Sequence, residues 1–240
     1  MRSAVIFGYN EFALEIANSL KTKYSDIALF VLEDKELRLL QDNNFKVSKF
    51  SIEDDWLNLQ GEYDIDELIV FCALEDTAEN IFLTISLRAV YENLIIIALS
   101  SDQESGRKLK MAGANKIIPI TQTTVNIITE MIERPFVTEI LNNILYSDDE
   151  LKIAQVTIEK DSEVIGKSVE SVDWKNRYGL LVVAIIRENL DTSFIYTKKA
   201  NREVMKEDDV LVIVGYENDI TEFEKTIGRR NNVNWRDWSW

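Results

Sequence analysis

The sequence predicts an α/β protein with a Rossmann-like, doubly wound parallel sheet, a crossover helix and a small α+β C-terminal lobe. Three observations predict this fold class. Short apolar runs alternate with stretches of helical spacing in the first half, a glycine turn follows the first run, and the pattern changes after an acidic segment at residues 147–150. Strands that alternate with helices of about 10–15 residues are typical of βαβ units in a parallel sheet.

Apolar, β-branched runs are the expected strands of the first lobe. They comprise residues 4–7, 27–32, 68–71, 94–98 and 116–118, with a weaker third strand at 46–50. Each of the main runs is almost continuously apolar, as expected for a sheet that is buried on both faces. Helical spacing between the runs is clearest in Phe12, Ile16 and Leu20, which recur every four residues.

A long amphipathic helix is expected at residues 121–146, after Pro119. Its apolar side chains form a stripe that continues across Pro135, where a kink near Arg134 is expected. The stripe comprises Val125, Ile128, Ile132, Phe136, Ile140, Ile144 and Leu145. Such a stripe needs a surface to cover it, which is either the chain's own sheet or a second subunit.

Short strands return after the acidic hinge. They are expected at residues 151–158, 180–187, 193–196 and 210–215, and a closing helix is expected at 218–227. This pattern predicts a small α+β lobe.

The chain therefore divides into four parts. They are a Rossmann-like N-lobe at 1–120, a crossover helix and hinge at 121–150, a C-terminal lobe at 151–228 and a tail at 229–240. The tail carries three tryptophans and has neither helical nor strand spacing. We expect it to be disordered or docked against a partner.

The composition excludes several classes of function. The chain of 240 residues has no histidine and one cysteine, which excludes a Ser-His-Asp triad, an imidazole zinc site and an internal disulfide. A formal charge of −15 argues against binding to nucleic acid or to an anionic membrane surface. No targeting or membrane-spanning segment is visible, so we expect a cytoplasmic protein, which could be part of something larger.

The turn after the first strand is the strongest candidate binding site. Its residues are Gly8, Tyr9, Asn10, Glu11, Phe12 and Ala13. They match the dinucleotide fingerprint G-x-G-x-x-G/A at its first and last positions, with Asn10 in place of the middle glycine. Asn tolerates a left-handed backbone, but its side chain occupies the space of a phosphate. Glu33, twenty residues beyond Ala13, would accept hydrogen bonds from ribose hydroxyls and repel a 2′-phosphate. The alternative is a turn that has lost its ligand.

Clustered carboxylates are a second candidate, because Ca²⁺ and Mg²⁺ prefer oxygen ligands. The clusters lie at residues 53–55, 75–76, 148–150, 161–163 and 207–209. None has the spacing of a defined cation loop, and with this net charge most are expected to be solvated. Cys72 has no neighbour in sequence that would activate its thiol, so we expect it to be a small buried residue.

Several stretches of the chain resemble the RCK family, the regulators of K⁺ conductance, also called TrkA-type N and C domains. Residues 4–13 resemble the family's opening strand and glycine turn. The most specific stretch is 108–119, KLKMAGANKIIP, which is similar to the family segment "kL..aGAd.Vi.P". Further similar stretches are 71–76 with Asn80, 164–168, 178–187 and 208–215.

This resemblance covers about residues 2–228 and implies a regulatory protein that is not an enzyme. It implies a crossover helix exchanged within a homodimer, and a higher ring such as an octamer. Ligand binding at the lobes would then open or close a K⁺ channel or uptake transporter. The chain would lie at the inner face of the plasma membrane, through a membrane subunit or a pore segment outside this sequence. The alternatives are a ligand-free scaffold and a nucleotide-dependent oxidoreductase.

The resemblance also implies where a ligand would bind. The family's Gly-Asp after the third strand falls near Phe50 and Ser51 here, so this position and Asn10 both depart from the family pattern. The expected contacts are Gly8, Tyr9, Asn10, Glu11, Phe12, Ala13, Glu33, Asp34, Ser51, Cys72 and Ala73. The expected ligand is a weakly bound adenine nucleotide (NAD, ADP or ATP), with a divalent cation as the alternative. No catalytic residue is expected.

Overall fold

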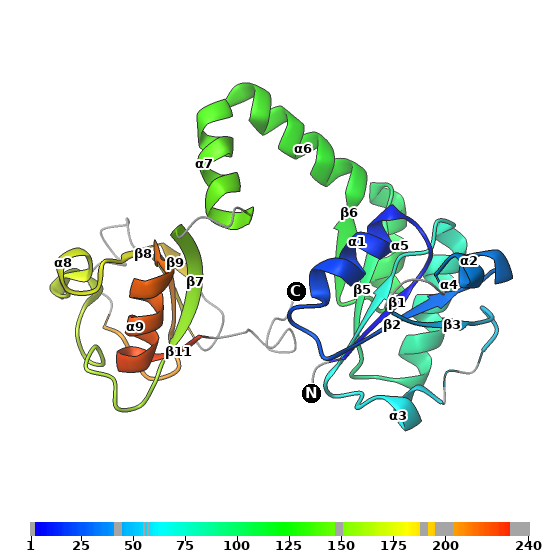
Figure 1. Cartoon of the computed structure of the whole chain (residues 1–240), viewed down its shortest axis with the longest axis horizontal. Coiled ribbons are helices and arrows are strands. Elements are labelled where there is room, and N and C mark those ends of the chain that lie inside the picture. The colour runs from blue at the N-terminus through cyan, green and yellow to red at the C-terminus, as the bar shows by residue number, and fades with distance from the viewer. Residues whose placement is uncertain are drawn as a thin grey trace. The chain divides into compact units, whose positions relative to one another are not determined.

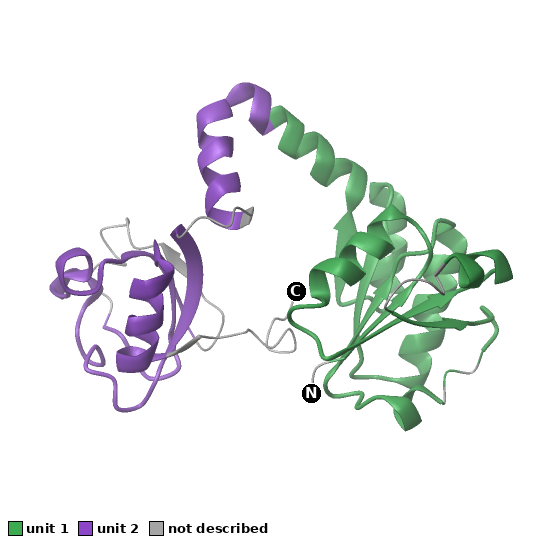
Figure 2. Ribbon diagram, in the orientation of Figure 1, with its two compact units in different colours: residues 1–129, 240 green, residues 130–239 purple. Residues whose placement is uncertain are grey.

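The computed structural model describes residues 3–40, 45–54, 56, 58–146, 151–187, 192–194 and 204–230. The chain forms two compact units that divide between Thr129 and Glu130 (Figures 1 and 2). Each unit is described by itself.

The first unit is built on a six-stranded sheet in the order β3-β2-β1-β4-β5-β6, and every pairing is parallel. The strands are β1 (Ser3–Phe7), β2 (Asp26–Val31), β3 (Lys46–Lys49), β4 (Leu68–Cys72), β5 (Ile95–Ser100) and β6 (Lys116–Pro119). This confirms the predicted doubly wound sheet. The strand order reverses between β1 and β4, and in open α/β sheets ligands bind at the carboxyl ends of the strands at such a switch point.

Helices cover both faces of this sheet. They are α1 (Glu11–Leu20), α2 (Asp34–Leu40), α3 (Leu59–Glu62), α4 (Thr77–Val90) and α5 (Gln103–Met111). Because side chains alternate along a strand, Val5 and Phe7 of β1 join the core beneath α3, α4 and α5, whereas Ala4 and Ile6 join the core beneath α1 and α2. The two cores explain why the strands are apolar at nearly every position.

The crossover consists of two helices, α6 (Ile120–Glu133) and α7 (Pro135–Tyr146). The break at Arg134 is where Pro135 predicts a kink, and Pro135 opens α7 at a position that tolerates its missing N–H. None of the residues of α6, which is described in full, is buried. Ile132 is 76% exposed and Phe136 is 79% exposed. Most of the predicted stripe is therefore uncovered within the chain.

The second unit contains an antiparallel sheet in the order β11-β7-β10-β8-β9. Its elements are β7 (Leu151–Ile158), the 3-10 turn η1 (Val169–Ser171), α8 (Trp174–Tyr178), β8 (Leu181–Ile186), β9 (Thr192–Phe194), β10 (Val210–Tyr216), α9 (Glu217–Ile227) and β11 (Gly228–Arg230). α9 covers this sheet with Ile220, Phe223 and Ile227, which are all buried. This agrees with the predicted small α+β lobe.

Strand β11 corrects one expectation about the tail. Arg229 and Arg230, placed in the tail by the sequence analysis, pair with Thr157 and Val156 of β7. Pairing of this kind depends on backbone hydrogen bonds to a neighbouring strand, so a short strand with no alternating pattern is missed. Residues 231–240, which include the tryptophans of the tail, and the hinge at 147–150 lie outside the described residues.

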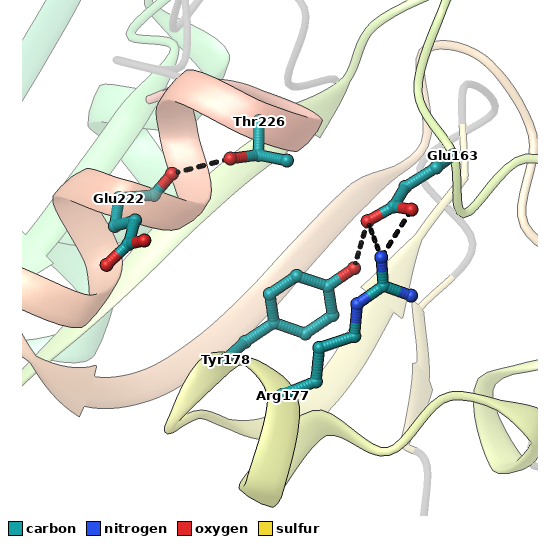
Figure 3. Close-up of polar contacts among 5 residues, drawn as sticks. All are labelled: Glu163, Arg177, Tyr178, Glu222 and Thr226. Atoms are coloured by element: carbon teal, nitrogen blue, oxygen red, sulfur yellow. Dashed lines mark hydrogen bonds and ion pairs between the residues drawn. The ribbon is translucent and has the colours of Figure 1, made fainter.

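A polar cluster joins α8 to the loop that follows β7. Tyr178 donates a hydrogen bond of 2.6 Å from its hydroxyl to Glu163 Oε1, and the Arg177 guanidinium contacts both oxygens of the same carboxylate (Figure 3). The hydrogen bonds from Tyr178 and Arg177 lower the pKa of Glu163, and the bond from Tyr178 has the larger effect. Burial raises the pKa of Tyr178 to about 12, helped by the bond to Glu163. Thr226 donates within α9 to the Glu222 carbonyl and is independent of this cluster.

The segment at 108–119 folds around the side chain of Arg88. The guanidinium donates to the carbonyl oxygens of Gly113, at 2.9 and 3.0 Å, and of Leu94, at 2.7 Å, and to Asn115 Oδ1, at 2.7 Å. Gly113 has a φ of +104°, and a Cβ built there would lie 2.6 Å from Arg88 Cγ. The glycine of the KLKMAGANKIIP stretch therefore leaves room for the side chain that joins α4, β5 and the turn before β6.

Gly113→Ala is expected to destabilise the first unit by about 1–3 kcal/mol, because the substitution combines a strained backbone with a clash. Urea unfolding followed by circular dichroism would measure the loss. Gly61→Ala is the matched control, since a Cβ at Gly61 in α3 would meet nothing within 4 Å. Equal stability of the two variants would contradict this account of Gly113.

Candidate nucleotide-binding site

The β1–α1 turn crosses the end of β4 at close range. Gly8 has a φ of +133°, and a Cβ at this position would lie 2.4 Å from the carbonyl oxygen of Ala73. Ala73 N donates a hydrogen bond of 2.8 Å to the Phe7 carbonyl, which joins the end of β1 to the end of β4, and Gly8 N donates one of 2.9 Å to the Phe30 carbonyl of β2. Only glycine fits this crossing, which explains the first position of the fingerprint.

Asn10 spans the switch point with its side chain. Its Oδ1 accepts a hydrogen bond of 2.9 Å from Ala13 N and so caps α1, while its Nδ2 donates to the Ala73 carbonyl at 2.6 Å. The backbone of Asn10 is extended, with a φ of −152°. Asn10 therefore suits this position because its side chain caps the helix. The tolerance of asparagine for a left-handed backbone plays no part, since the backbone is extended.

The other residues of the turn differ in accessibility. Glu11 and Phe12 are exposed in the first turn of α1, whereas Ala13 is buried against the sheet and Tyr9 packs partly against the same core. A carboxylate in the first turn stabilises the helix through the dipole but repels an approaching phosphate. Asn10 takes the N–H of Ala13, and the remaining N–H groups at the start of α1 form a favourable place for an anion.

A cation that the sequence analysis missed lies beside Glu33 at the end of β2. Lys35 Nζ lies 2.7 Å from Glu33 Oε2, and both side chains are largely exposed. The hydrogen bond and charge of Glu33 raise the pKa of Lys35, and Glu75 adds a smaller effect. The short spacing between Glu33 and Lys35 in the sequence could have indicated this ion pair.

Three of the expected contacts lie away from this crossing. Asp34 pairs with Lys49 at 2.8 Å, and this hydrogen bond and charge lower the pKa of Asp34. Ser51 sits in a turn after β3, where its N–H donates to Asp54 Oδ2 at 2.8 Å. Cys72 is fully buried in the core, and burial raises the pKa of its thiol to about 12.

A pocket of about 330 Å³ opens at the carboxyl ends of β4 and β5. Its lining includes Asn10, Phe12, Ala73, Glu75, Asn80 and Ser100. The structure thus brings Asn10, Phe12 and Ala73 together at one pocket, whereas Glu33, Asp34 and Ser51 do not line it.

Asn80 holds the two strand ends at this pocket in place. Its Nδ2 donates to the carbonyl oxygens of Cys72, at 3.2 Å, and Leu99, at 3.1 Å, and its Oδ1 accepts from Leu74 N at 3.2 Å. The side chain is 2% exposed and nearly all of its hydrogen-bonding capacity is used. Asn80 therefore sets the shape of the pocket and is not free to bind a ligand.

In the part of the chain that the structure describes, no three carboxylates or thiols come together as a metal site. The cluster at 148–150 lies outside that part. Among the same described residues, the helices are too short or too polar to cross a bilayer.

Two family models match this chain in the order of its two lobes. Residues 4–120 match the TrkA-N domain, and residues 153–228 match the TrkA-C domain. The chain belongs to the RCK family of TrkA-type proteins. This confirms the resemblance inferred from the KLKMAGANKIIP stretch and its neighbours.

Relatives of this RCK chain include two potassium-transport proteins. "Probable potassium channel protein 2" of Methanocaldococcus jannaschii is 26% identical over 167 residues, which is 67% of this chain and 47% of the relative. "Ktr system potassium uptake protein C" of Bacillus subtilis is 23% identical over 227 residues, which is 92% of this chain and 96% of the relative. The chain thus spans about half of the first relative and nearly all of the second.

A solved structure shares this fold. The human SLO3 gating ring matches with a TM-score of 0.67 at 11% identity, over 94% of this chain and 46% of that chain. The "GsuK channel bound to NAD" matches with a TM-score of 0.48 at 18% identity, over 94% of this chain and 38% of that chain.

Cys72 is expected to resist thiol reagents at pH 8 in the folded protein, because only the thiolate reacts and burial keeps this thiol protonated. Ellman's reagent would detect no thiol in the native chain and one after denaturation. Met111→Cys is the control, since Met111 is 88% exposed and a thiol there should react at once. The raised pKa also predicts that stability falls as pH rises above about 8.5, where the unfolded thiol ionises and the folded one does not. Rapid labelling of native wild type would contradict the prediction.

Proposed function

We propose that this chain is a cytoplasmic regulatory module that controls K⁺ transport through a membrane channel or uptake transporter. The observation that carries the proposal is the TrkA-N and TrkA-C pair on one chain, joined by an amphipathic crossover with an uncovered apolar stripe. Both relatives described above are named as potassium-transport proteins. The proposed activity is regulation without catalysis, in keeping with a chain that has no histidine and a buried, protonated thiol.

We further propose an adenine nucleotide as the regulatory ligand, with its phosphates at the start of α1. The N–H groups and positive end of the helix would hold the phosphates, and Glu33 would accept hydrogen bonds from a ribose. Asn10 would have to release the Ala73 carbonyl to make room. Since such a hydrogen bond contributes about 0.5–1.5 kcal/mol, this release weakens binding without abolishing it.

Ligand control requires that the nucleotide bind one conformation better than another, and this differential affinity is the coupling to the pore. The Asn10–Ala73 bond favours a second candidate, a ligand-free scaffold, because the side chain already fills the position of the fingerprint's middle glycine. The two candidates differ in a single measurable property, which is stabilisation by adenine nucleotides.

The proposed partner of α6 and α7 is a second copy of the chain. Their exposed apolar residues include Val125, Ile128, Met131, Ile132, Phe136, Val137, Ile140, Leu141 and Leu145. An exposed apolar stripe of this kind is typical of a protein interface. Dimers joined in this way would then assemble into a ring, octamer-like in the simplest case, against the membrane subunit.

Asn10→Gly is expected to bind ADP about 2- to 10-fold more tightly than wild type, because no side-chain bond must break first. Glu33→Ala is expected to bind about 10-fold more weakly through loss of its ribose contacts. Isothermal titration calorimetry would measure both. Glu62→Ala, which removes an exposed carboxylate of α3, should behave as wild type. Absence of ADP binding to wild type and to Asn10→Gly would favour the scaffold.

The double variant Ile132→Asp, Phe136→Asp is expected to be monomeric or to aggregate, because two carboxylates would be buried in the dimer interface. Light scattering coupled to gel filtration would report the mass. The control is Asn126→Asp with Thr129→Asp, which adds the same charge at polar positions of α6. A monomeric wild type at micromolar concentration would refute the interface.

A further inference from the structure

One edge of the second sheet is only partly paired. Strand β7 has eight residues, and β10 pairs with it from Leu151 to Thr157. On the other side, β11 pairs only with Val156, Thr157 and Ile158, and no other described strand lies there (Figure 1). The described strands therefore leave the first half of β7 open along this edge.

The hydrogen-bond pattern shows which backbone groups face the open edge. Glu159 N donates to the Ile227 carbonyl on the β11 side, at 3.3 Å, whereas Ile158 N donates to the Asp209 carbonyl on the β10 side, at 2.9 Å. Since successive residues of a strand direct their N–H and C=O groups to opposite sides, the odd-numbered residues of β7 direct theirs toward β11. Those that lie before the β11 pairing are Leu151, Ile153 and Gln155. Unpaired groups of this kind are a template for another strand.

The same residues lie on the face of the sheet that α9 does not cover. α9 packs on the face that holds Val156 and Ile158, because these residues share a core with Phe223. Side chains alternate along a strand, so Ile153 and Gln155 lie on the opposite face. Ile153 is 42% exposed, and the Oε1 of Gln155 is buried with no hydrogen-bond partner among the described residues. Both features are unfavourable unless another segment covers them.

The sequence that follows β11 matches this edge in register. Residues 231–240 read NNVNWRDWSW and directly follow Arg230, the last residue of β11. β11 pairs Gly228 with Ile158 and Arg230 with Val156. Continuing this antiparallel register gives three pairs, which are Asn231 with Gln155, Val233 with Ile153, and Trp235 with Leu151.

Each of these pairs is chemically matched. Opposite residues of an antiparallel pair share a face, so apolar side chains at positions 233 and 235 would meet the apolar side chains of β7. Tryptophan is suited to this place because it buries about 150–250 Å². The amide of Asn231 can donate to the unpaired Oε1 of Gln155. A register shifted by one residue would lose all three matches.

We propose that residues 231–235 extend β11 along β7 and cover the open edge of the second sheet within the same chain. Val233 and Trp235 pack against β7 on its uncovered face, and Asn231 donates to Gln155. The segment is joined covalently to β11, so the pairing needs no second molecule. An edge covered in this way cannot recruit a strand from another protein, which protects the lobe from edge-to-edge association.

An engineered disulfide tests the register. Opposite residues of a hydrogen-bonded antiparallel pair have Cα atoms about 5.5 Å apart, which a disulfide can span. The double variant Ile153→Cys, Val233→Cys is expected to form a disulfide within one chain about 10-fold faster on mild oxidation than Ile153→Cys, Asn232→Cys. This control places its second thiol on the other face of the sheet. Peptide mapping by mass spectrometry would identify the bond, and Cys72 is buried and should not take part.

Equal rates for the two double variants would show that no register is fixed and would overturn the inference. A disulfide between two chains would show that a second copy supplies the segment, and it would overturn the inference as well.

Two proline variants give a second test that adds no thiol. In the proposed register the N–H of Val233 points to β7 and that of Asn232 points away, so only Val233→Pro removes a hydrogen bond of the ladder. The measured quantity is hydrogen exchange of the Ile153 amide in the full chain. We expect it to be about 10-fold faster in Val233→Pro than in wild type and unchanged in Asn232→Pro.

The Ala154 amide is the internal reference, because it faces β10 and should stay protected in all three proteins. An Ile153 amide that exchanges at the same rate in wild type and in both variants would contradict the pairing.

Discussion

The close crossing of Gly8 over the end of β4 is the constraint on which the candidate site depends. Because no Cβ separates the turn from the Ala73 carbonyl, α1 begins directly above the switch point. Asn10 then reaches the same carbonyl and caps the helix with the other end of its amide. The glycine that permits this crossing thus also lets the Asn10 side chain reach across the switch point.

Much of the fold could be predicted because its signals are local. The apolar runs that became β1, β2, β4 and β5 are buried on both faces, so nearly every residue in them is hydrophobic. Pro135 marked the break between α6 and α7 for an equally local reason. Strand β11 could not be predicted, because its pairing with β7 depends on a partner about 70 residues away in sequence.

Some residues of the candidate site could likewise be predicted from local sequence, and others could not. Gly8 and Glu33 follow from the spacing of a known turn, whereas Asn80 matters through backbone groups that other segments bring to it. The hydrogen bonds of Asn80 join the ends of β4 and β5, which are far apart in the chain. No spacing within a single segment can indicate such a role.

The crossover begins at the pocket, so the lining of the pocket includes the base of a long helix. Ile120 and Thr121, the first residues of α6, line the same pocket as Ser100. A helix of 14 residues is about 21 Å long, so a tilt of about 5° at its base moves its far end by about 2 Å. Asn80 holds the strand ends on the other side of the pocket, so an occupant that displaced the wall of the pocket would act on the base of α6. The helix whose base lines the pocket thus carries exposed apolar residues toward its far end, among them Ile132.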